Sequence, residues 1–168
     1  MKLNLGCSDD LKPGYLNVDI ALGKEQDPVR FPYQQADLNQ SWPWEDSSVD
    51  EIFAWDVAEH LDSQIHFFNE AHRCLRAGGL LDLAVPCVHL LDGRCNPGAW
   101  ADPTHKQFFT LDTRYYYGEQ WNDPANERGR FGEAYGITAL FRGDWTLRDY
   151  GEGAERRSKI FAKLTAVK

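Results

Sequence analysis

The sequence predicts a single α/β domain built on a mostly parallel sheet. Strand-like segments alternate with helix signals through the first half of the chain, a pattern that is typical of parallel sheets. A glycine turn at Gly6 follows the first strand-like segment, and Asp19 ends the second. The chain has 168 residues, of which 42% are hydrophobic, so it can bury one sizeable core.

Five strand-like segments and one helical segment fill the first half of the chain. Asp62 or Ser63 is expected to cap a helix that runs to about Arg76, and Gly78 and Gly79 are expected to stop it. We expect the strands at Leu3–Leu5, Leu16–Asp19, Gln34–Leu38, Val49–Trp55 and Leu80–Val85, with the third as the weakest.

The connection between the first two strands is short. Only residues 7–14 lie between Gly6 and Tyr15, whereas a parallel crossover usually needs a dozen or more residues. One face of the sheet is therefore expected to be thinly covered. Apolar surface left on that face favours a homodimer.

The second half of the chain divides into an irregular stretch and a strand-rich end. Residues 87–135 are rich in Gly, Pro, Asn, Asp and aromatic residues, which indicates a lid or a substrate-binding segment with short helical turns near Thr110–Tyr117. Residues 136–168 return to strand character at Trp145–Tyr150 and Lys159–Val167, and this pattern predicts an antiparallel hairpin.

Composition narrows the class of protein. A net charge of −8 disfavours sequence-independent binding to nucleic acid. No apolar run is long enough to cross a bilayer, and the N-terminus lacks the layout of a signal peptide. The four cysteines form no C-x-x-C pair, which favours a reduced, cytoplasmic protein.

The glycine turn and the acid that follows it point to a nucleoside ligand. Gly6 lets backbone approach a ligand closely, and the carboxylate of Asp19 can accept hydrogen bonds from ribose hydroxyls. The full G-x-G-x-x-G fingerprint is missing, which argues against a nicotinamide-dependent oxidoreductase.

Six short motifs resemble, in their order and spacing, the class I S-adenosylmethionine-dependent methyltransferases of the short bacterial and phage type. In chain order they are Leu3–Cys7, Gly14–Asp19, Ala36–Leu38, Val49–Ile52, Ala58–Leu61 and Glu70–Gly79. The resemblance covers the chain to about Pro86. It implies a Rossmann-like sheet of strand order 3-2-1-4-5-7-6, with the seventh strand antiparallel. Residues 1–86 would bind the cofactor, and one domain would span residues 1–168.

The resemblance assigns S-adenosylmethionine as the cofactor and S-adenosylhomocysteine as the product. It places the turn beside the methionine part, an acid on the ribose hydroxyls, an acid–leucine pair on adenine, and the end of the fourth strand at the methionine end. The residues at these positions are Gly6, Cys7, Asp19, Asp37, Leu38 and Trp55. The structural alternatives are an ordinary turn glycine for Gly6, a solvated strand-end carboxylate for Asp19, a loop acid for Asp37 and core packing for Trp55.

One position departs from the family pattern. The turn commonly has glycine at its third place, where this chain has Ser8. Serine fits there only if the backbone avoids strongly positive φ. The departure leaves the affinity for the cofactor open, and Ser8 is an additional candidate donor to the cofactor carboxylate.

Methyl transfer needs an aligned nucleophile and sometimes a base. The candidate catalytic residues are His60, His105 and Asp56, with Glu59 as a further candidate base. A loop histidine that orders the local backbone is the alternative for His60. Many enzymes of this type position the substrate without a strong base.

The acceptor is expected to be a small molecule, a sugar or another metabolite. The stretch Asp102–Thr110 is expected to fold over the substrate mouth, where His105 and Lys106 can bind an anionic or hydroxyl-bearing group. The neighbouring aromatic residues either stack on the acceptor or form a small secondary core; they are Trp100, Tyr115, Tyr116, Tyr117 and Trp121. A catalytically idle module that binds the cofactor and acts through protein contacts is the alternative function.

A zinc site was also weighed. Cys87, His89, Cys95 and His105 offer suitable ligand types. Their spacing fits no common zinc finger, so no metal site is expected from the sequence.

Overall fold

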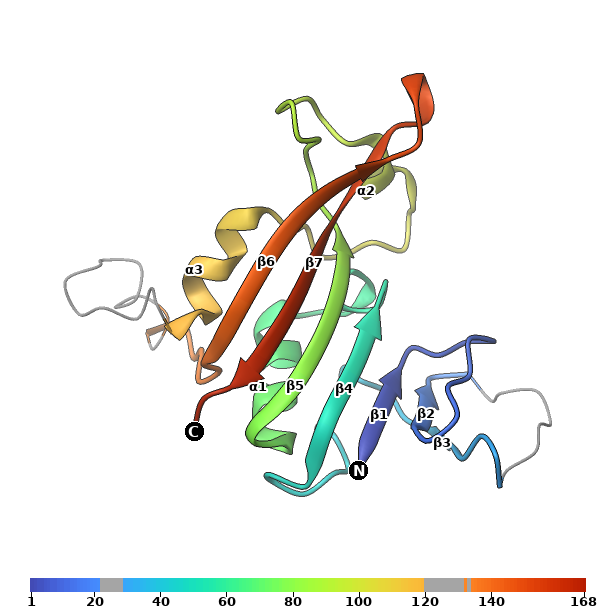
Figure 1. The fold of residues 1–168 in the computed structure, drawn as a ribbon, viewed down its shortest axis with the longest axis vertical. Helices are drawn as coiled ribbons and strands as arrows, with labels where there is room; N and C mark the ends of the chain where they lie inside the picture. Colours follow the sequence, from blue (N-terminus) through green and yellow to red (C-terminus); the bar gives the residue numbers. More distant parts are fainter. Residues whose placement is uncertain (22–28, 120–131, 133) are drawn as a thin grey trace.

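The computed structural model describes residues 1–21, 29–119, 132 and 134–168, and these form a seven-stranded sheet (Figure 1). The strand order is β3-β2-β1-β4-β5-β7-β6. The first five strands run parallel, while β7 is antiparallel to both β5 and β6. The predicted fold class and strand order are confirmed.

The strands are β1 Lys2–Leu5, β2 Leu16–Asp19, β3 Tyr33–Gln35, β4 Val49–Trp55, β5 Leu75–Pro86, β6 Phe141–Tyr150 and β7 Arg157–Ala166. The α-helices are α1 Gln64–Cys74, α2 Pro97–Ala101 and α3 Arg114–Tyr117. The 3-10 helices are η1 Ala58–His60, η2 Leu111–Thr113 and η4 Gly153–Glu155.

Two buried asparagines hold the short connection between β1 and β2. Asn4 donates one hydrogen bond to the side chain of Asn17 (2.8 Å) and another to the carbonyl of Asp10 (2.7 Å). The side-chain oxygen of Asn17 also accepts from the amide of Lys12 (2.8 Å). Through these bonds, the carbonyl of Asp10 and the amide of Lys12 have hydrogen-bond partners although the connection forms no helix.

The helix α1 begins where the sequence predicts and ends earlier. Ser63 caps it by accepting from the amide of His66 (3.2 Å). The helix ends at Cys74 rather than near Arg76, because Leu75 is fully buried and extended and already pairs with Val49 of β4. The prediction that the glycines stop this helix was therefore wrong by about one turn.

The third strand is shorter than predicted and leaves residues 36–38 outside the sheet. Asp37 closes a turn there: its carboxylate accepts from the amide of Asn39 (2.9 Å) and its carbonyl accepts from the amide of Gln40 (3.1 Å). Side chains of this kind stabilise turns in competition with strand pairing. The consequence is that Asp37 and Leu38 lie in a loop beyond the strand end.

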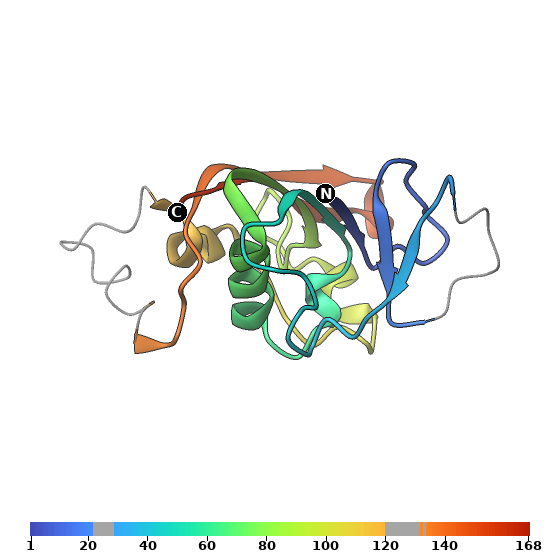
Figure 2. The same cartoon turned by 90° about the horizontal axis from the view of Figure 1, so that it is seen from below.

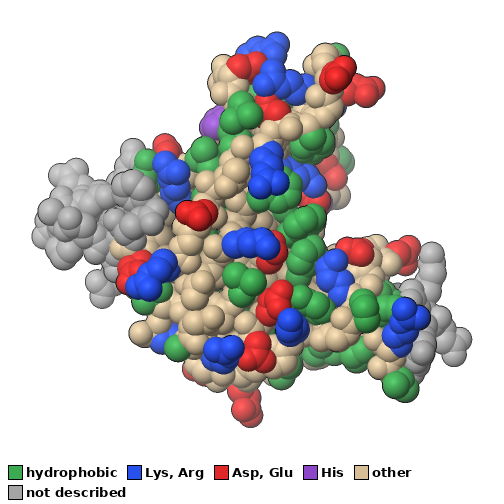
Figure 3. Space-filling view, in the orientation of Figure 1, with side chains coloured by type: hydrophobic (Ala, Val, Ile, Leu, Met, Phe, Trp, Pro, Cys, Tyr) green, Lys and Arg blue, Asp and Glu red, His purple; other side chains and the backbone are tan. Residues whose placement is uncertain are grey.

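The main helices lie on one side of the sheet (Figure 2). The opposite, outer face carries charged and hydrophobic side chains along β4, β5 and β7, as the space-filling view shows (Figure 3). Asp82 pairs with Lys163 across this face (3.5 Å), and Phe161 packs there against Trp55. The thin cover expected from the short first connection is thus present, but the face is partly polar.

No helix among the described residues is long and apolar enough to cross a membrane.

The segment that precedes β4 is anchored to α1 by one arginine. Arg73 donates to the carbonyls of Trp42 and Trp44 and to the carboxylates of Asp46 and Glu70, at 2.7–3.1 Å. These bonds hold two buried tryptophans over the core.

We expect Arg73→Ala to lower the free energy of unfolding by about 2 kcal/mol, because several hydrogen bonds to a charged group are lost together. Arg76→Ala is the matched control, since Arg76 is exposed and pairs with Asp50 at the surface. It should cost less than about 1 kcal/mol. Denaturant unfolding measures both values, and equal losses would contradict the anchoring role of Arg73.

Candidate active site

A pocket of about 310 Å³ lies where β1, β2 and β4 end. Its volume is within the range of small-ligand sites, and its place at the carboxyl ends of parallel strands is where open α/β sheets bind ligands. Six of the nine predicted site residues line it: Gly6, Asp19, Asp37, Leu38, Asp56 and His60.

Gly6 has no room for a side chain. Its φ is +60°, and a Cβ atom there would lie 2.4 Å from Cγ2 of Val57, which also lines the pocket. The turn after β1 therefore packs directly against the segment after β4. The position requires glycine for both backbone conformation and space.

Asp19 ties the turn after β1 to the end of β2. Its Oδ2 accepts from the amide of Ser8 (2.9 Å) and its Oδ1 accepts from the amide of Ala21 (3.0 Å). Each carboxylate oxygen can accept a second hydrogen bond from a ligand hydroxyl. The carboxylate is thereby fixed in orientation at the rim of the pocket.

Ser8 adopts a positive φ in this turn. Its φ is +42°, in the left-handed region that favours glycine. The condition for serine was a backbone that avoids strongly positive φ, and Ser8 instead occupies the turn at a moderately positive value. The hydrogen bond from its amide to Asp19 helps to hold the strained turn.

Cys7, Trp55 and His105 do not line the pocket. Cys7 is buried, its amide donates to the carbonyl of Val18 (3.1 Å), and burial raises the pKa of its thiol to about 11. Trp55 lies on the outer face of the sheet and donates to Asp82 (2.9 Å). A strand alternates its side chains between faces, which places Trp55 with Phe53.

His60 and His105 lie together although 45 positions separate them in the sequence. Their ring centroids are 4.9 Å apart. One ring nitrogen of each histidine and a carboxylate oxygen of Glu59 all lie within 4.8 Å of one another. His60 and Glu59 come from η1, directly after β4, and His105 comes from the segment after α2.

The segment around His105 is fixed to η1 through backbone. The amides of Lys106 and Gln107 both donate to the carbonyl of Glu59, at 2.7 and 2.9 Å. The ammonium of Lys106 pairs with Asp62 (2.6 Å), and Lys106 lines the pocket. This placement agrees with the expectation that Asp102–Thr110 folds over the mouth of the site.

Glu59 is a buried acid without a hydrogen-bond partner. Its side chain is 1% exposed, and neither carboxylate oxygen accepts a hydrogen bond from the described residues. Burial raises its pKa to about 8, and the negative charge of Asp56 adds to this effect. From the sequence, Glu59 is only a further candidate base. Its place between Ala58 and His60, directly after the fourth strand, is the signal that could have identified it as a site residue.

Asp56 follows β4 with a φ of +55° and forms an ion pair with Lys159 of β7. This pair joins the end of β4 to the C-terminal hairpin. The carboxylate therefore lines the pocket while its charge is compensated.

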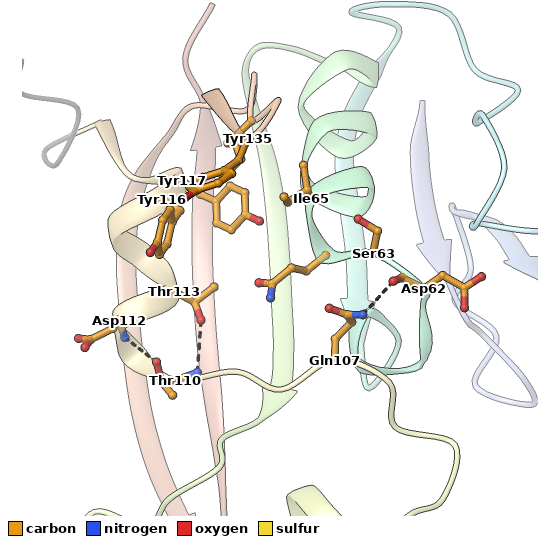
Figure 4. Close-up of a pocket in the computed structure, with 12 residues that line it drawn as sticks. Asp62, Ser63, Ile65, Gln107, Thr110, Asp112, Thr113, Tyr116, Tyr117 and Tyr135 are labelled. Atoms are coloured by element: carbon orange, nitrogen blue, oxygen red, sulfur yellow. Dashed lines mark hydrogen bonds between the residues drawn. The ribbon is translucent and has the colours of Figure 1, made fainter. Parts of the chain in front are cut away.

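A second cavity of about 530 Å³ lies between α1 and α3 (Figure 4). Ile65 lines it from α1, Tyr116 from α3, and Gln107 from the segment between the two cavities. The side-chain amide of Gln107 donates to the carbonyl of Asp62 (2.9 Å).

The aromatic residues take different places. Tyr117 is buried and stacks on Phe68 at 3.9 Å, as the secondary-core alternative predicted, whereas Tyr116 is half-exposed at the cavity. Trp100 is exposed and stacks on Phe108 at 4.1 Å. Trp121 lies outside the described residues.

The cysteine–histidine set weighed for zinc is not assembled in the described part of the chain. The thiol of Cys87 lies 3.7 Å from Nδ1 of His89, but Cys95 is exposed and His105 lies beside His60 instead. All four cysteines are free thiols.

Residues 10–83 match a family model described as a methyltransferase domain. The matched segment begins after the Gly6–Ser8 turn, includes the strands β2 to β4 and most of β5, and contains the pocket residues Asp19, Asp37 and His60. Over this part of the chain, the sequence resembles the methyltransferase domain family. The match and the shared fold support S-adenosylmethionine as the methyl donor and S-adenosylhomocysteine as the product.

Solved structures share the fold of this methyltransferase at low sequence identity. A chain of the complex between the Haloferax volcanii Trm112 methyltransferase activator and a methyltransferase matches with a TM-score of 0.62 and 11% identity, covering 99% of this chain and 82% of that one. A Mesorhizobium loti S-adenosylmethionine-dependent methyltransferase matches with a TM-score of 0.58 and 13% identity, covering 98% and 90%.

A third similar structure is Haemonchus contortus phosphoethanolamine N-methyltransferase 2 in complex with S-adenosyl-L-methionine. Its TM-score is 0.61 at 12% identity, and the match covers 99% of this chain and 48% of that one. No curated protein matches the sequence. At these identities the structural matches show the fold alone.

We expect Gly6→Ala to weaken binding of S-adenosylmethionine at least 10-fold, because the new methyl group collides with Val57 in the wall of the pocket. Gly14→Ala is the matched control: its φ is +81° but nothing lies within 4 Å of the added Cβ. It should carry only the conformational cost of about 1 kcal/mol in stability. Calorimetric titration measures the affinities, and equal affinities in the two variants would contradict the steric argument.

Proposed function

We propose that the methyltransferase transfers the methyl group of S-adenosylmethionine to a small-molecule acceptor, such as a sugar or another metabolite, bound beside His60 and His105. The observation that carries this proposal is the convergence of these two histidines next to the pocket after β4. In the reaction the S–CH₃ bond breaks, a bond from the acceptor to the methyl carbon forms, S-adenosylhomocysteine leaves, and the proton that the acceptor loses passes to a nearby base or to water.

The cofactor-binding residues are proposed from the pocket and the resemblance together. Gly6 lets the backbone approach the methionine part, and Asp19 presents a fixed carboxylate to the ribose hydroxyls. Asp37 and Leu38, in the loop after β3, border the region for adenine. The predicted contacts of Cys7 and Trp55 with the cofactor have less support, because both side chains lie outside the pocket lining.

The acceptor is proposed to bind on the side of Asp56, His60 and His105. The second cavity lies across the Lys106–Asp62 ion pair from the cofactor pocket and offers space and tyrosine rings for the rest of the acceptor. A structural neighbour from Haemonchus contortus was solved with phosphomonomethylethanolamine and S-adenosylhomocysteine, so this fold accommodates acceptors of that size.

We further propose one domain over residues 1–168, with residues 1–86 binding the cofactor, residues 87–135 closing the substrate side, and residues 136–168 completing the sheet. Four free thiols support a reducing, cytoplasmic environment. The homodimer stays a prediction, and ion pairs on the outer sheet face weaken the argument that this face needs cover. Sedimentation at working concentrations distinguishes a dimer from a monomer.

We expect Asp19→Asn to weaken binding of S-adenosylmethionine by about 1–3 kcal/mol, or roughly 5- to 150-fold, because charge-assisted hydrogen bonds to the ribose are lost. Asp10→Asn is the control, since Asp10 is exposed, pairs with Lys12 (3.1 Å) and does not line the pocket. Calorimetry with S-adenosylmethionine, S-adenosylhomocysteine and NAD gives the affinities. Binding of NAD but of neither sulfur nucleoside would overturn the assignment of the cofactor.

We expect His105→Ala to bind S-adenosylmethionine within about 3-fold of the wild type and to lose roughly 10²- to 10⁴-fold in turnover. His66→Ala, on α1 and outside both cavities, should retain both properties. Release of S-adenosylhomocysteine over a panel of sugar and metabolite acceptors measures turnover. Tight cofactor binding without turnover on any acceptor would favour the idle module, for which the strained Ser8 turn is the supporting feature.

A further inference from the structure

We propose that Glu59, His60 and His105 form a binding site for one divalent ion of a first-row transition metal at the acceptor side of the pocket. One potential ligand atom from each residue lies within 4.8 Å of the other two, and the group combines two imidazoles with one carboxylate. This ligand set is characteristic of metal sites that keep open positions for a substrate or water.

The hydrogen bonds of His105 leave one of its nitrogens available to a metal. Nδ1 lies 3.0 Å from the carbonyl of Ala99. A carbonyl can only accept, so Nδ1 carries a proton. Nε2 lies 3.9 Å from Oδ2 of Asp102, beyond hydrogen-bond distance, and can offer its lone pair to a metal. A histidine that donates from one nitrogen to a backbone carbonyl and coordinates through the other is a common arrangement in metal sites.

His60 is held in the same tautomer by a different partner. The hydroxyl of Thr104 donates its proton to Asp102 (2.6 Å), and the oxygen of that hydroxyl lies 2.9 Å from Nδ1 of His60. With its own proton engaged, the hydroxyl accepts from Nδ1, which again leaves Nε2 with a lone pair. Asp102 thus orients His60 through Thr104.

Glu59 supplies the third, negatively charged ligand. Its carboxylate is 1% exposed, and neither oxygen has a hydrogen-bond partner among the described residues. An unpartnered buried carboxylate is costly, and a cation between it and the two nitrogens removes that cost. Two lysines near the cluster are already paired, Lys159 with Asp56 and Lys106 with Asp62, so neither replaces such a cation.

The backbone is arranged to hold the three ligands together. The carbonyl of Glu59 accepts from the amides of Lys106 and Gln107, which fixes the segment carrying His105 against η1. Binding would draw the ligand atoms closer than their present 4.8 Å spread, to the distances of about 2.0–2.2 Å from a central ion that imidazole and carboxylate ligands adopt.

The catalytic role of this metal site rests on the proposed function, methyl transfer. The site would add to that function a way of activating the acceptor. A divalent ion beside the methyl donor would bind an oxygen of the acceptor and favour its deprotonated form. The acceptor class is then one that offers a hydroxyl group as the nucleophile. The histidines position the acceptor through the ion rather than acting as free bases.

The test titrates the full-length, chelator-treated protein with Mn²⁺, Zn²⁺ and Co²⁺ by calorimetry, with Co²⁺ absorption as a report on nitrogen ligands. We expect one equivalent to bind, and His105→Ala and Glu59→Gln to weaken binding at least 10-fold. His66→Ala is the matched control for loss of a histidine, because His66 lies on α1 outside the cluster. It should bind the ions as the wild type does.

Absence of stoichiometric binding by the wild type, or equal weakening in His105→Ala and His66→Ala, would overturn the site. Thermal unfolding with and without the ion provides a second readout: the ion should raise the midpoint for the wild type and for His66→Ala only. If Glu59→Gln does not fold, His105→Ala alone decides the question. Affinity for S-adenosylmethionine is measured on the same samples, so failure of the metal site and failure of the proposed function remain distinguishable.

Discussion

The buried hydrogen bond between Asn4 and Asn17 is the constraint on which the cofactor side of this molecule depends. It joins β1 to β2 in the core and, with the bonds to Asp10 and Lys12, closes the ten-residue connection over residues 6–15, where a helix would normally lie. The ends of both strands are thereby brought to one place. Only in that arrangement can Asp19 accept from the amide of Ser8 and can the turn at Gly6 pack on Val57.

The acceptor side depends on a different short element, the 3-10 helix η1. It begins three residues after β4 and carries Glu59 and His60. The backbone carbonyl of Glu59 holds the segment 106–107, while its side chain faces the two histidines without a partner. Glu59 therefore has two roles: its backbone holds residues 106–107 against η1, and its side chain belongs to the cluster with the two histidines. A buried acid without a hydrogen-bond partner is retained at a cost in stability, which is typical of functional groups rather than structural ones.

The sequence predicted most of the sheet because local patterns report local structure. The glycine turn, the acid at the end of β2 and the loop acid Asp37 could be found from their order alone. Trp55 could not be placed, because its direction depends on strand alternation relative to the pocket. The cluster of Glu59, His60 and His105 could not be predicted either, since α1, β5 and α2 lie between its members in the sequence and only the tertiary fold brings His105 back to η1.

The outer face explains how so short a methyltransferase chain remains folded with helices mainly on one side. Parallel sheets are normally covered on both faces, and their strands are apolar on both. Here Asp82 and Lys163 face each other across β5 and β7, and the ring of Phe161 packs against Trp55 between neighbouring charges. This alternation of buried and polar side chains is the pattern of a sheet that faces water. The hairpin β6–β7 extends that pattern, and Lys159 at its β7 end reaches Asp56 in the pocket. The polar outer face is thus continuous with the pocket, so a side chain of the face that stabilises the open sheet also helps to position Asp56 in the pocket wall.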